Sequence, residues 1–585
     1  MGILDTPPRW NLNNLQSGGN IKMFENHLCR IKEELQEIQN CSVPNQLKEI
    51  ELIRISALIK QIESAESFYY CLTTENIEHS LITSLNGTIS TLKYQVHMLK
   101  SDLQEELSKM SKDNLNGWVS RINHKKIIMD LLKEEVNNSS EEKLVSNFSR
   151  ETLSGLEDIY IQLRNNIKVI VNSDKKSKEI PFVEAIDLAM SHPIHNNRTL
   201  LFKELNQALK SQANVFASIY NQIVGLRLNE NALKKVDYLD KSLNLNGISK
   251  QIINTMWDVV DTNLPTLSKY IKIKAREVGK ERLSWHELMT SSLQEVPFRI
   301  EFSQAVDGIT KSLGSIDRNI PQFIKTAISK GWVDAEQRSS KQPGGFCAPF
   351  FLEGESRISL SYDNSLDSAR ILAHELGHAW HFHQMKDIPS LSFSDESLEM
   401  TMAETSSIFF ETAFIDYLIE NTMDISIKKA ILQSKIERCL NYLMNIRGAF
   451  LFENSFYKYR KNGQLDVEQI EELSLKCQEI AYGNSLSEYE PFVWIKYIQF
   501  YEANTPFYNY PYSFGFLLSI GLLEIAKEDN QFDQKFRKFL NETGILPLEL
   551  LIKKHFNIDL SEPEFWEKSI KRLITDIEYY SQYCE

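Results

Sequence analysis

The N-terminal third of the chain places apolar residues at the spacing of an α-helix. Two sets keep this spacing, at Leu52, Ile55, Ile59 and Ile62 and at Ile89, Leu92, Val96, Leu99 and Leu103. A stripe of this period puts the apolar side chains on one face of a helix. The break at 114–117 keeps each helix short enough to pack as a hairpin rather than as one long coiled coil. Residues 20–190 are therefore predicted to form successive amphipathic helices.

The helical pattern continues beyond a predicted boundary at 191–193, where a proline follows a serine and a histidine. We therefore expect an N-terminal helical lobe over 1–190 and a second domain over 191–585. Further helices are expected within 211–227 and 251–278 and after about residue 425, apart from the Tyr- and Pro-rich segment 504–515.

Residues 332–362 follow a different pattern. A turn is indicated by Lys341-Gln342-Pro343-Gly344-Gly345, and the residues from Arg357 to Tyr362 alternate apolar with polar side chains as a strand does. A small β-sheet is expected here. With only 22 glycines and 16 prolines in 585 residues, the chain has about half the usual share of these residues, which favours long helices elsewhere. The predicted fold class is mainly α.

Composition excludes several classes of protein. The formal net charge is −14 and no basic stripe stands out, which argues against a nucleic-acid partner. The seven cysteines are scattered and odd in number, which fits a reducing compartment better than a disulfide framework. No apolar leader opens the chain, and no segment approaches the length of a membrane span. We therefore expect a cytoplasmic protein without a membrane partner.

The strongest chemical signal is the motif of His374, Glu375 and His378. Two histidines four residues apart share one face of a helix and can converge on a single metal ion. Glu375 would project beside that ion, where a base for a bound water is needed. Asn364 or Ser365 can cap the start of such a helix. The simpler alternative is a pair of histidines on an ordinary buried helix.

A catalytic zinc ion usually takes three protein ligands, so a third is expected nearby. Residues 398–411 predict a second helix, and the connection at 386–396 would let it fold back beside the first. Glu404 is the predicted third ligand. Glu411 lies seven residues further on and shares its face, so it is a candidate for orienting a ligand. For either glutamate alone, a solvated helix face would be the simpler interpretation.

These motifs resemble those of the oligoendopeptidase F family of zinc peptidases, which is related to thimet oligopeptidase. The resemblance is carried by the following segments: Trp10–Leu15, Gly331–Cys347, Ile358–Tyr362, His374–His381, Ala403–Ser407 with Glu411, and Phe507–Gly515. It therefore spans about residues 10 to 520. It implies a large helical enclosure with a deep central cleft, an N-terminal lobe that closes over the catalytic half, and a small β-sheet beside the histidine helix.

The resemblance also implies roles for residues outside the metal motif. Tyr508 and Tyr512 would donate hydrogen bonds to the oxyanion of the reaction, and Tyr510 would contact the substrate. Without the resemblance, packing side chains with one polar end would be the preferred interpretation of these alternating tyrosines. Family members often carry a histidine shortly before these tyrosines, and this chain has none. His381 would lie beside the metal site without binding the ion.

Substrate contacts are implied for Gly344, Gly345 and Ser359. The two glycines lack side chains, so their loop could approach a peptide closely. The strand that contains Ser359 could pair with an extended peptide through its backbone. Substrates would be short peptides, because the enclosed channel of the family excludes folded proteins.

Together these features predict a zinc metallo-endopeptidase with one Zn²⁺ per chain, held by His374, His378 and Glu404. Glu375 would take a proton from a water that the zinc polarises. A related zinc carboxypeptidase or dipeptidyl carboxypeptidase can show the same helix and third glutamate. A peptide-binding scaffold without catalysis is a further alternative, but the retained Glu375 argues against it.

Overall fold

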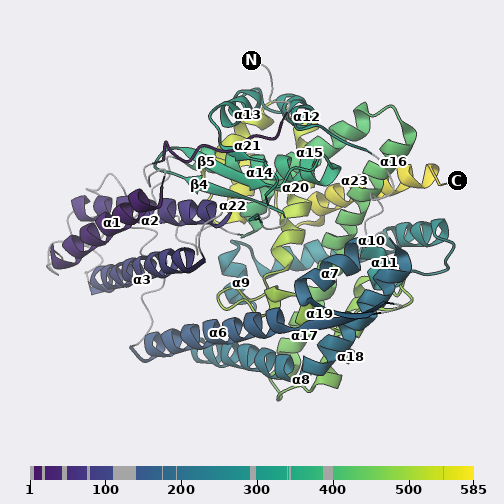
Figure 1. The fold of residues 1–585 in the computed structure, drawn as a ribbon, viewed down its shortest axis with the longest axis horizontal. Coiled ribbons are helices and arrows are strands. Elements are labelled where there is room, and N and C mark those ends of the chain that lie inside the picture. Colours follow the sequence, from purple (N-terminus) through teal and green to yellow (C-terminus); the bar gives the residue numbers. More distant parts are fainter. Residues whose placement is uncertain are drawn as a thin grey trace. The chain divides into compact units, whose positions relative to one another are not determined.

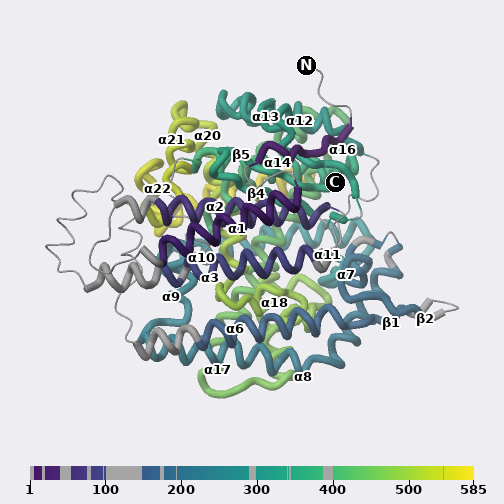
Figure 2. The backbone as a smooth tube through the Cα atoms, turned by 60° about the vertical axis from the view of Figure 1, so that its left-hand side comes forward, coloured from purple at the N-terminus to yellow at the C-terminus, as the bar shows by residue number. Residues whose placement is uncertain are grey.

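The structure is a computed structural model, and it describes residues 6–15, 20–41, 49–75, 79–109, 140–173, 176–192, 194–289, 298–338, 340–341, 344–386, 400–544 and 546–584. The chain forms two compact units, each assembled from separated stretches of sequence. The first unit draws on 1–137, 298–418 and 525–557, and the second on 138–297, 419–524 and 558–585. Both are mainly helical, as predicted (Figures 1 and 2).

The first unit is built on a three-stranded sheet. Its strands are β3 (Val333–Asp334), β4 (Gly345–Phe350) and β5 (Glu355–Leu360). Their order is β3-β5-β4, with β5 parallel to β3 and antiparallel to β4. The helices of this unit are α1 (Ile21–Cys41), α2 (Glu49–Thr73), α3 (His79–Lys109), α12 (Phe302–Gly314), α13 (Ile320–Ser329), α14 (Leu366–Met385), most of α15 (Met400–Asn421), α21 (Phe532–Asn541) and α22 (Leu548–Phe556).

Helices cover both faces of this sheet. On one face α1, α2 and α3 share a core with Ala348 and Phe350 of β4. The apolar stripe predicted for α3 is buried in that core, with Ile89 2% and Leu92 1% exposed. On the other face α14 packs against β4 and β5. The N-terminal helices thus share a unit with the sheet, so the units cut across the boundary expected near residue 190, and that boundary stays a prediction.

The second unit is a set of packed helices with one antiparallel hairpin, β1 (Lys168–Ser173) and β2 (Lys176–Pro181). Its helices are α6 (Ser140–Asn166), α7 (Phe182–Ser191), α8 (His195–Lys234), α9 (Asp240–Leu245), α10 (Lys250–Glu277), α11 (Trp285–Met289), α16 (Ile425–Leu440), the π-helix η3 (Asn441–Asn445), α17 (Ile446–Arg460), α18 (Val467–Ala481), α19 (Val493–Lys496), the 3₁₀-helix η4 (Ile498–Phe500), most of α20 (Tyr510–Glu528) and α23 (Pro563–Gln582).

The structure corrects one predicted boundary. The segment 504–515 was expected to be irregular throughout, but α20 begins within it at Tyr510. Pro511 lies in the first turn of α20, where its missing N–H leaves no helical hydrogen bond unmade. The predicted break at 114–117 and the predicted connection over 387–396 lie outside the described residues. Among the residues that the structure describes, no helix is long and apolar enough to cross a bilayer.

Candidate active site

The helix of the histidine motif is fixed at its start by a side-chain cap. Ser365 Oγ accepts a hydrogen bond from Ser368 N at 3.0 Å, as expected of an N-cap serine. Leu376 anchors the buried face of α14. His374 and His378 lie one turn apart, and their Nε2 atoms are 3.2 Å from each other. The spacing of four residues therefore brings both imidazoles to one point, as predicted.

A glycine lets α15 lie close against α14. A Cβ atom at Gly377 would come within 2.6 Å of Ser406 O and of Ser407 Cα, which are both backbone atoms of α15. Only a residue without a side chain tolerates this approach. Glu404 stands one turn before Ser407, so the approach carries its carboxylate to the histidines. A glycine between two histidines of a helix was a visible signal of close packing, and sequence reasoning missed it.

Three donor atoms converge between the two helices. Glu404 Oε2 lies 3.3 Å from His374 Nε2 and 3.8 Å from His378 Nε2. Two ligands that lie about 2.1 Å from a tetrahedral zinc ion are about 3.4 Å from each other. The three observed separations of 3.2, 3.3 and 3.8 Å are close to that value. The donor set therefore fits a metal ion, and its chemistry of two imidazoles and a carboxylate suits zinc.

A second layer of hydrogen bonds orients the donors. His374 Nδ1 lies 3.2 Å from Glu411 Oε2, which also accepts a hydrogen bond from Arg370 at 3.1 Å. Ser407 Oγ donates to Glu404 Oε2 at 3.0 Å. Because Glu411 engages Nδ1, the Nε2 atom of His374 is turned toward Glu404. Arg370 and Ser407 were not predicted, although Arg370 lies four residues before His374 and so on the same helical face.

Glu375 lies buried beside this cluster, with 5% of its surface exposed. Burial raises the pKa of its carboxyl group to about 7. A Cβ atom added to Gly345 of β4 would be 3.0 Å from Glu375 Oε1, so β4 begins against this carboxylate. Burial also raises the pKa of the Cys347 thiol well above its ordinary value, and the charge of Glu375 raises it further. A neutral thiol is a poor nucleophile, so Cys347 is not favoured as a reactive group of this site.

The carboxylates of the cluster stabilise positive charge between the two helices. Burial lowers the pKa of His378 to about 4. Burial also acts to lower the pKa of His374, but hydrogen bonds to Glu404 and Glu411 outweigh it and raise this pKa to about 10. Burial alone would raise the pKa of Glu404, yet its hydrogen bond with His374 and the nearby histidine charges lower it to about 2. At neutral pH these pKa values correspond to an ionised Glu404, a neutral His378 and a protonated His374, so a metal ion that binds here would take the place of the proton on His374.

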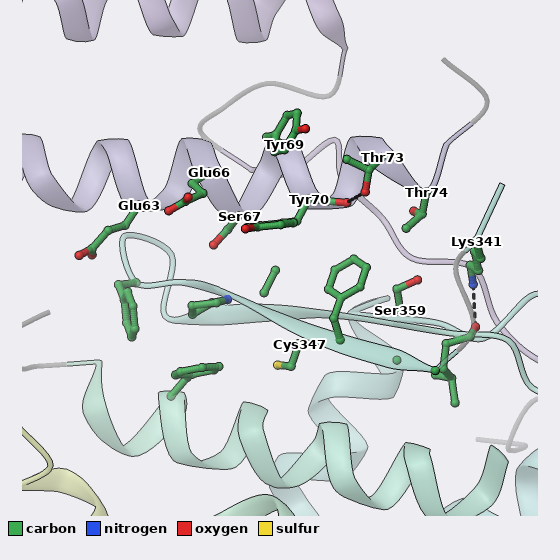
Figure 3. A pocket seen from close by; sticks show the side chains of 18 of the residues that line it. Glu63, Glu66, Ser67, Tyr69, Tyr70, Thr73, Thr74, Lys341, Cys347 and Ser359 are labelled. Carbon is green, nitrogen blue, oxygen red and sulfur yellow. Dashed lines mark hydrogen bonds between the residues drawn. The ribbon is translucent and has the colours of Figure 1, made fainter. Parts of the chain in front are cut away.

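A groove of about 680 Å³ runs along β4 between α2 and the sheet. Figure 3 shows Ser67 and Tyr70 of α2 over the strands, and Cys347 on the opposite side of the sheet. The predicted contacts Gly344, Gly345 and Ser359 all line this groove. Gly344 has φ of +95°, a backbone conformation that favours glycine.

The open edge of the sheet is β4, so the prediction that the strand of Ser359 pairs with a peptide is wrong. That strand, β5, is central, with β3 on one side and β4 on the other. Ile358 N donates to Trp332 O on the β3 side. In an antiparallel pair, its partner Cys347 must then direct its own N–H and C=O away from β5. No strand among the described residues pairs with that outer edge.

Three further predicted residues lie in the second unit. The rings of Tyr508 and Tyr512 are 6.1 Å apart at the start of α20. Tyr510 is fully buried, and its hydroxyl is bonded to Ser242 at 3.3 Å and to Asn246 at 3.2 Å. These bonds hold Tyr510 in the core of its own unit, so we leave it out of the proposed substrate contacts.

His381, in the first unit, makes a hydrogen bond that supports the fold. Its Nε2 atom lies 2.9 Å from Thr543 Oγ1, just after α21. Burial lowers the pKa of His381 to about 3, so the ring is neutral. His381 therefore ties α14 to the end of α21, and its predicted place beside the metal donors stays a prediction.

The chain is similar to known peptidases in sequence and to solved structures in fold. The model of peptidase family M3 matches residues 188–572. An oligoendopeptidase F homolog of Borreliella burgdorferi is 23% identical over 512 residues, which cover 82% of each chain. A crystal structure from Chlamydophila abortus has a TM-score of 0.81 at 18% identity and covers 98% of both chains. Oligoendopeptidase-F from Enterococcus faecium has a TM-score of 0.69 at 16% identity, over 96% of this chain and 98% of that one. The similarity to these two structures shows that the chain shares their fold.

Proposed function

The chain belongs to peptidase family M3, and on that premise we propose that it is a zinc metallo-endopeptidase that hydrolyses short oligopeptides. Family membership makes it a metal-dependent oligopeptidase. The observation that carries the finer proposal is the convergence of His374, His378 and Glu404 beside the buried Glu375. The scattered cysteines support a cytoplasmic location, and the six cysteines whose side chains the structure describes are free thiols.

His374, His378 and Glu404 would hold the zinc ion. When bound, a zinc ion supplies a Lewis acid that lowers the pKa of a water and polarises the scissile carbonyl. Glu411 would keep His374 in the orientation that offers Nε2 to the ion. Ser407 would do the same for the Glu404 carboxylate.

Glu375 would move the proton. Its carboxylate takes a proton from the attacking water as the new carbon–oxygen bond forms at the scissile carbonyl. It then gives this proton to the leaving nitrogen as the carbon–nitrogen bond breaks, so that one peptide becomes an acid and an amine. The buried position of Glu375 keeps bulk water from competing for that proton.

Tyr508 and Tyr512 would donate hydrogen bonds to the oxyanion formed during this attack. Their role is proposed on the resemblance of Phe507–Gly515 to the tyrosine-bearing segment of the family. Each hydroxyl can reach beyond an apolar ring, as an oxyanion donor must.

The outer edge of β4 would bind the peptide backbone. Gly345 and Cys347 direct their N–H and C=O groups to this edge, because backbone direction alternates with a period of two. An extended peptide could add there as a further strand with little preference for side chains. Pro349 takes the next outward position and has no N–H to donate, as is usual for proline in an edge strand. The row of hydrogen bonds between β4 and a bound peptide, here called the ladder, would therefore lack a donor at Pro349.

Replacing Pro349 with alanine is expected to lengthen this ladder by one hydrogen bond. One such bond adds about 0.5–1.5 kcal/mol, so KM should fall about 2- to 10-fold for peptides that reach residue 349. Peptides too short to reach it should show unchanged KM, and kcat should be unchanged for both. Kinetics over a series of internally quenched peptides measures this, with Pro563→Ala at the start of α23 as a matched control. An equal change for short and long peptides would contradict the ladder.

Removal of the metal tests the proposed function directly. A chelator is expected to reduce hydrolysis of quenched peptides by at least about 100-fold, because the attacking water then loses its activation. Added zinc should restore the rate with about one ion bound per chain. Hydrolysis that persists after the metal has been removed would contradict the proposal.

The same assay distinguishes the mode of cleavage. Peptides with a blocked C-terminus should be cut as fast as free ones by an endopeptidase, whereas a carboxypeptidase would leave them intact. Zinc binding without cleavage of any peptide would favour a non-catalytic scaffold.

A further inference from the structure

The backbone that leads to the tyrosine segment is anchored by charged side chains of other helices in the second unit. Arg227 of α8 donates hydrogen bonds to Glu502 O and, at 3.3 Å, to Ala503 O. Glu157 of α6 accepts a hydrogen bond from Ala503 N at 3.0 Å. Two helices thus hold both polar groups of one residue, Ala503, which is itself buried.

A third anchor acts at a strained residue. Phe507 has φ of +57°, a conformation that non-glycine residues seldom adopt. Glu453 of α17 accepts a hydrogen bond from Phe507 N at 3.0 Å, and the Phe507 ring packs 5.1 Å from that of Tyr457. Such a conformation persists only where its surroundings impose it. Tyr508 is the next residue, so its direction depends on this anchor.

Two of these anchors are charged groups in the protein interior. Glu453 is 1% exposed and Arg227 is 6% exposed, while Glu157 is half-buried. Burying a charged group is unfavourable unless hydrogen bonds or opposite charges compensate. Burial raises the pKa of Glu453 to about 7, and the charge of Arg227 opposes this rise. Apolar side chains would fill the same space at lower cost, which indicates that the polar groups serve the backbone they hold.

We propose that Glu157, Arg227 and Glu453 are positioning residues that fix segment 502–507 and thereby the orientation of Tyr508 and Tyr512 during peptide hydrolysis. The proposal rests on the proposed function, in which these tyrosines are oxyanion donors. A donor stabilises a transition state only when it is held within about 0.5 Å of its productive position. A misplacement of about 1 Å can lower the rate about 100-fold. The three charged residues act through the backbone of the segment.

The test separates the loss of an anchor from the loss of a charge. Glu157→Ala and Glu453→Ala remove an acceptor, whereas Glu157→Gln and Glu453→Gln keep a carbonyl oxygen in its place. Each alanine variant is expected to lower kcat about 10- to 100-fold with KM changed less than about twofold, because the tyrosines act on the transition state. Each glutamine variant should recover most of kcat. Because Glu157 is only half-buried, its alanine variant should fold even if Glu453→Ala does not.

Two further readouts distinguish positioning from stability. Hydrogen exchange of the amides in 502–512 should quicken in the alanine variants. Glu490→Ala is the matched control, because Glu490 is fully buried in the same unit and accepts a hydrogen bond from Phe492 N at 2.9 Å. It should lower Tm without changing kcat per folded molecule.

A double-mutant analysis decides the outcome. In a Tyr508→Phe, Tyr512→Phe background, Glu157→Ala should cause no further loss of kcat. Additive losses, or a normal kcat despite quickened exchange, would overturn the positioning role. If the tyrosine variant itself keeps the wild-type kcat, the proposed oxyanion donors fail and the catalytic role of the anchors fails with them. If the tyrosine variant loses kcat and the alanine variants do not, only the positioning role is overturned.

Discussion

Glu375→Gln is expected to lower kcat for peptide hydrolysis by about 10³- to 10⁴-fold, which corresponds to about 4–5.5 kcal/mol of transition-state stabilisation. Glutamine has nearly the same shape as glutamate but cannot accept the proton of the attacking water. Glu375 is buried and lies against Gly345, so its carboxylate is not exchanged easily for a group from solvent. The loss should appear in kcat and in kcat/KM alike, because the proton is transferred only in the transition state.

The metal content of this variant makes the result specific. His374, His378 and Glu404 are unchanged, so about one zinc ion should remain bound per chain. Glu336→Gln is a suitable control, because Glu336 is a half-exposed carboxylate of the same unit that pairs with Arg338. Cleavage by Glu375→Gln at the wild-type rate would assign the base to another residue. Loss of zinc together with activity would show that Glu375 supports the site rather than the reaction.

The metal cluster was accessible to sequence reasoning because its signal is local. Two histidines four residues apart on a helix must share a face, whatever the rest of the fold does. Glu404 required one further step, a second helix that returns beside the first. The structure brings Glu404 to His374 and His378, and their binding of zinc stays a proposal. The closeness of the two helices was not predicted, because it depends on which residues of α15 face Gly377.

The identity of the open strand could not be predicted in the same way. The alternation of apolar and polar residues from Arg357 to Tyr362 indicates a strand with two different faces. It does not indicate which strands pair with its two edges. Its parallel neighbour β3 is only two residues long. The sequence of β4 does not alternate clearly, because helices cover both faces of the sheet. Pro349 was the one local signal of an edge strand.

The tyrosine segment shows a related limit. Tyr508, Tyr510 and Tyr512 look like one alternating set if the segment is extended. Because α20 begins at Tyr510, successive residues there turn by about 100° rather than 180°. Tyr510 consequently enters the core of the second unit, where Ser242 and Asn246 bind its hydroxyl. Because the segment 504–515 was expected to be irregular throughout, the early start of α20 was missed, and with it the burial of Tyr510.

Gly377→Ala is expected to weaken zinc binding at least about tenfold and to lower activity with it. The added methyl group would lie 2.6 Å from Ser406 O and Ser407 Cα, and these backbone atoms cannot rotate away as a side chain can. Restoring an ordinary contact of about 3.5 Å requires α15 to move by about 1 Å. Glu404 lies on the same turn of α15, so its carboxylate would move away from His374 and His378 by a similar distance. Metal sites tolerate only about 0.2 Å in ligand distance, so affinity should fall.

Gly87→Ala provides the matched control, because Gly87 is a helical glycine of the same unit with no atom within 4 Å of an added Cβ. Alanine favours a helix by about 1 kcal/mol over glycine, so this control should be neutral or slightly stabilising. At Gly377 the same propensity gain is opposed by overpacking of about 1–3 kcal/mol, so Tm should fall or stay level. Zinc affinity from competition with a chelator, measured beside Tm, separates the two effects. A Gly377→Ala variant that binds zinc as tightly as wild type would show that α15 can move away from α14 while the Glu404 carboxylate stays beside the histidines. The close approach of the two helices would then not be required to assemble the site.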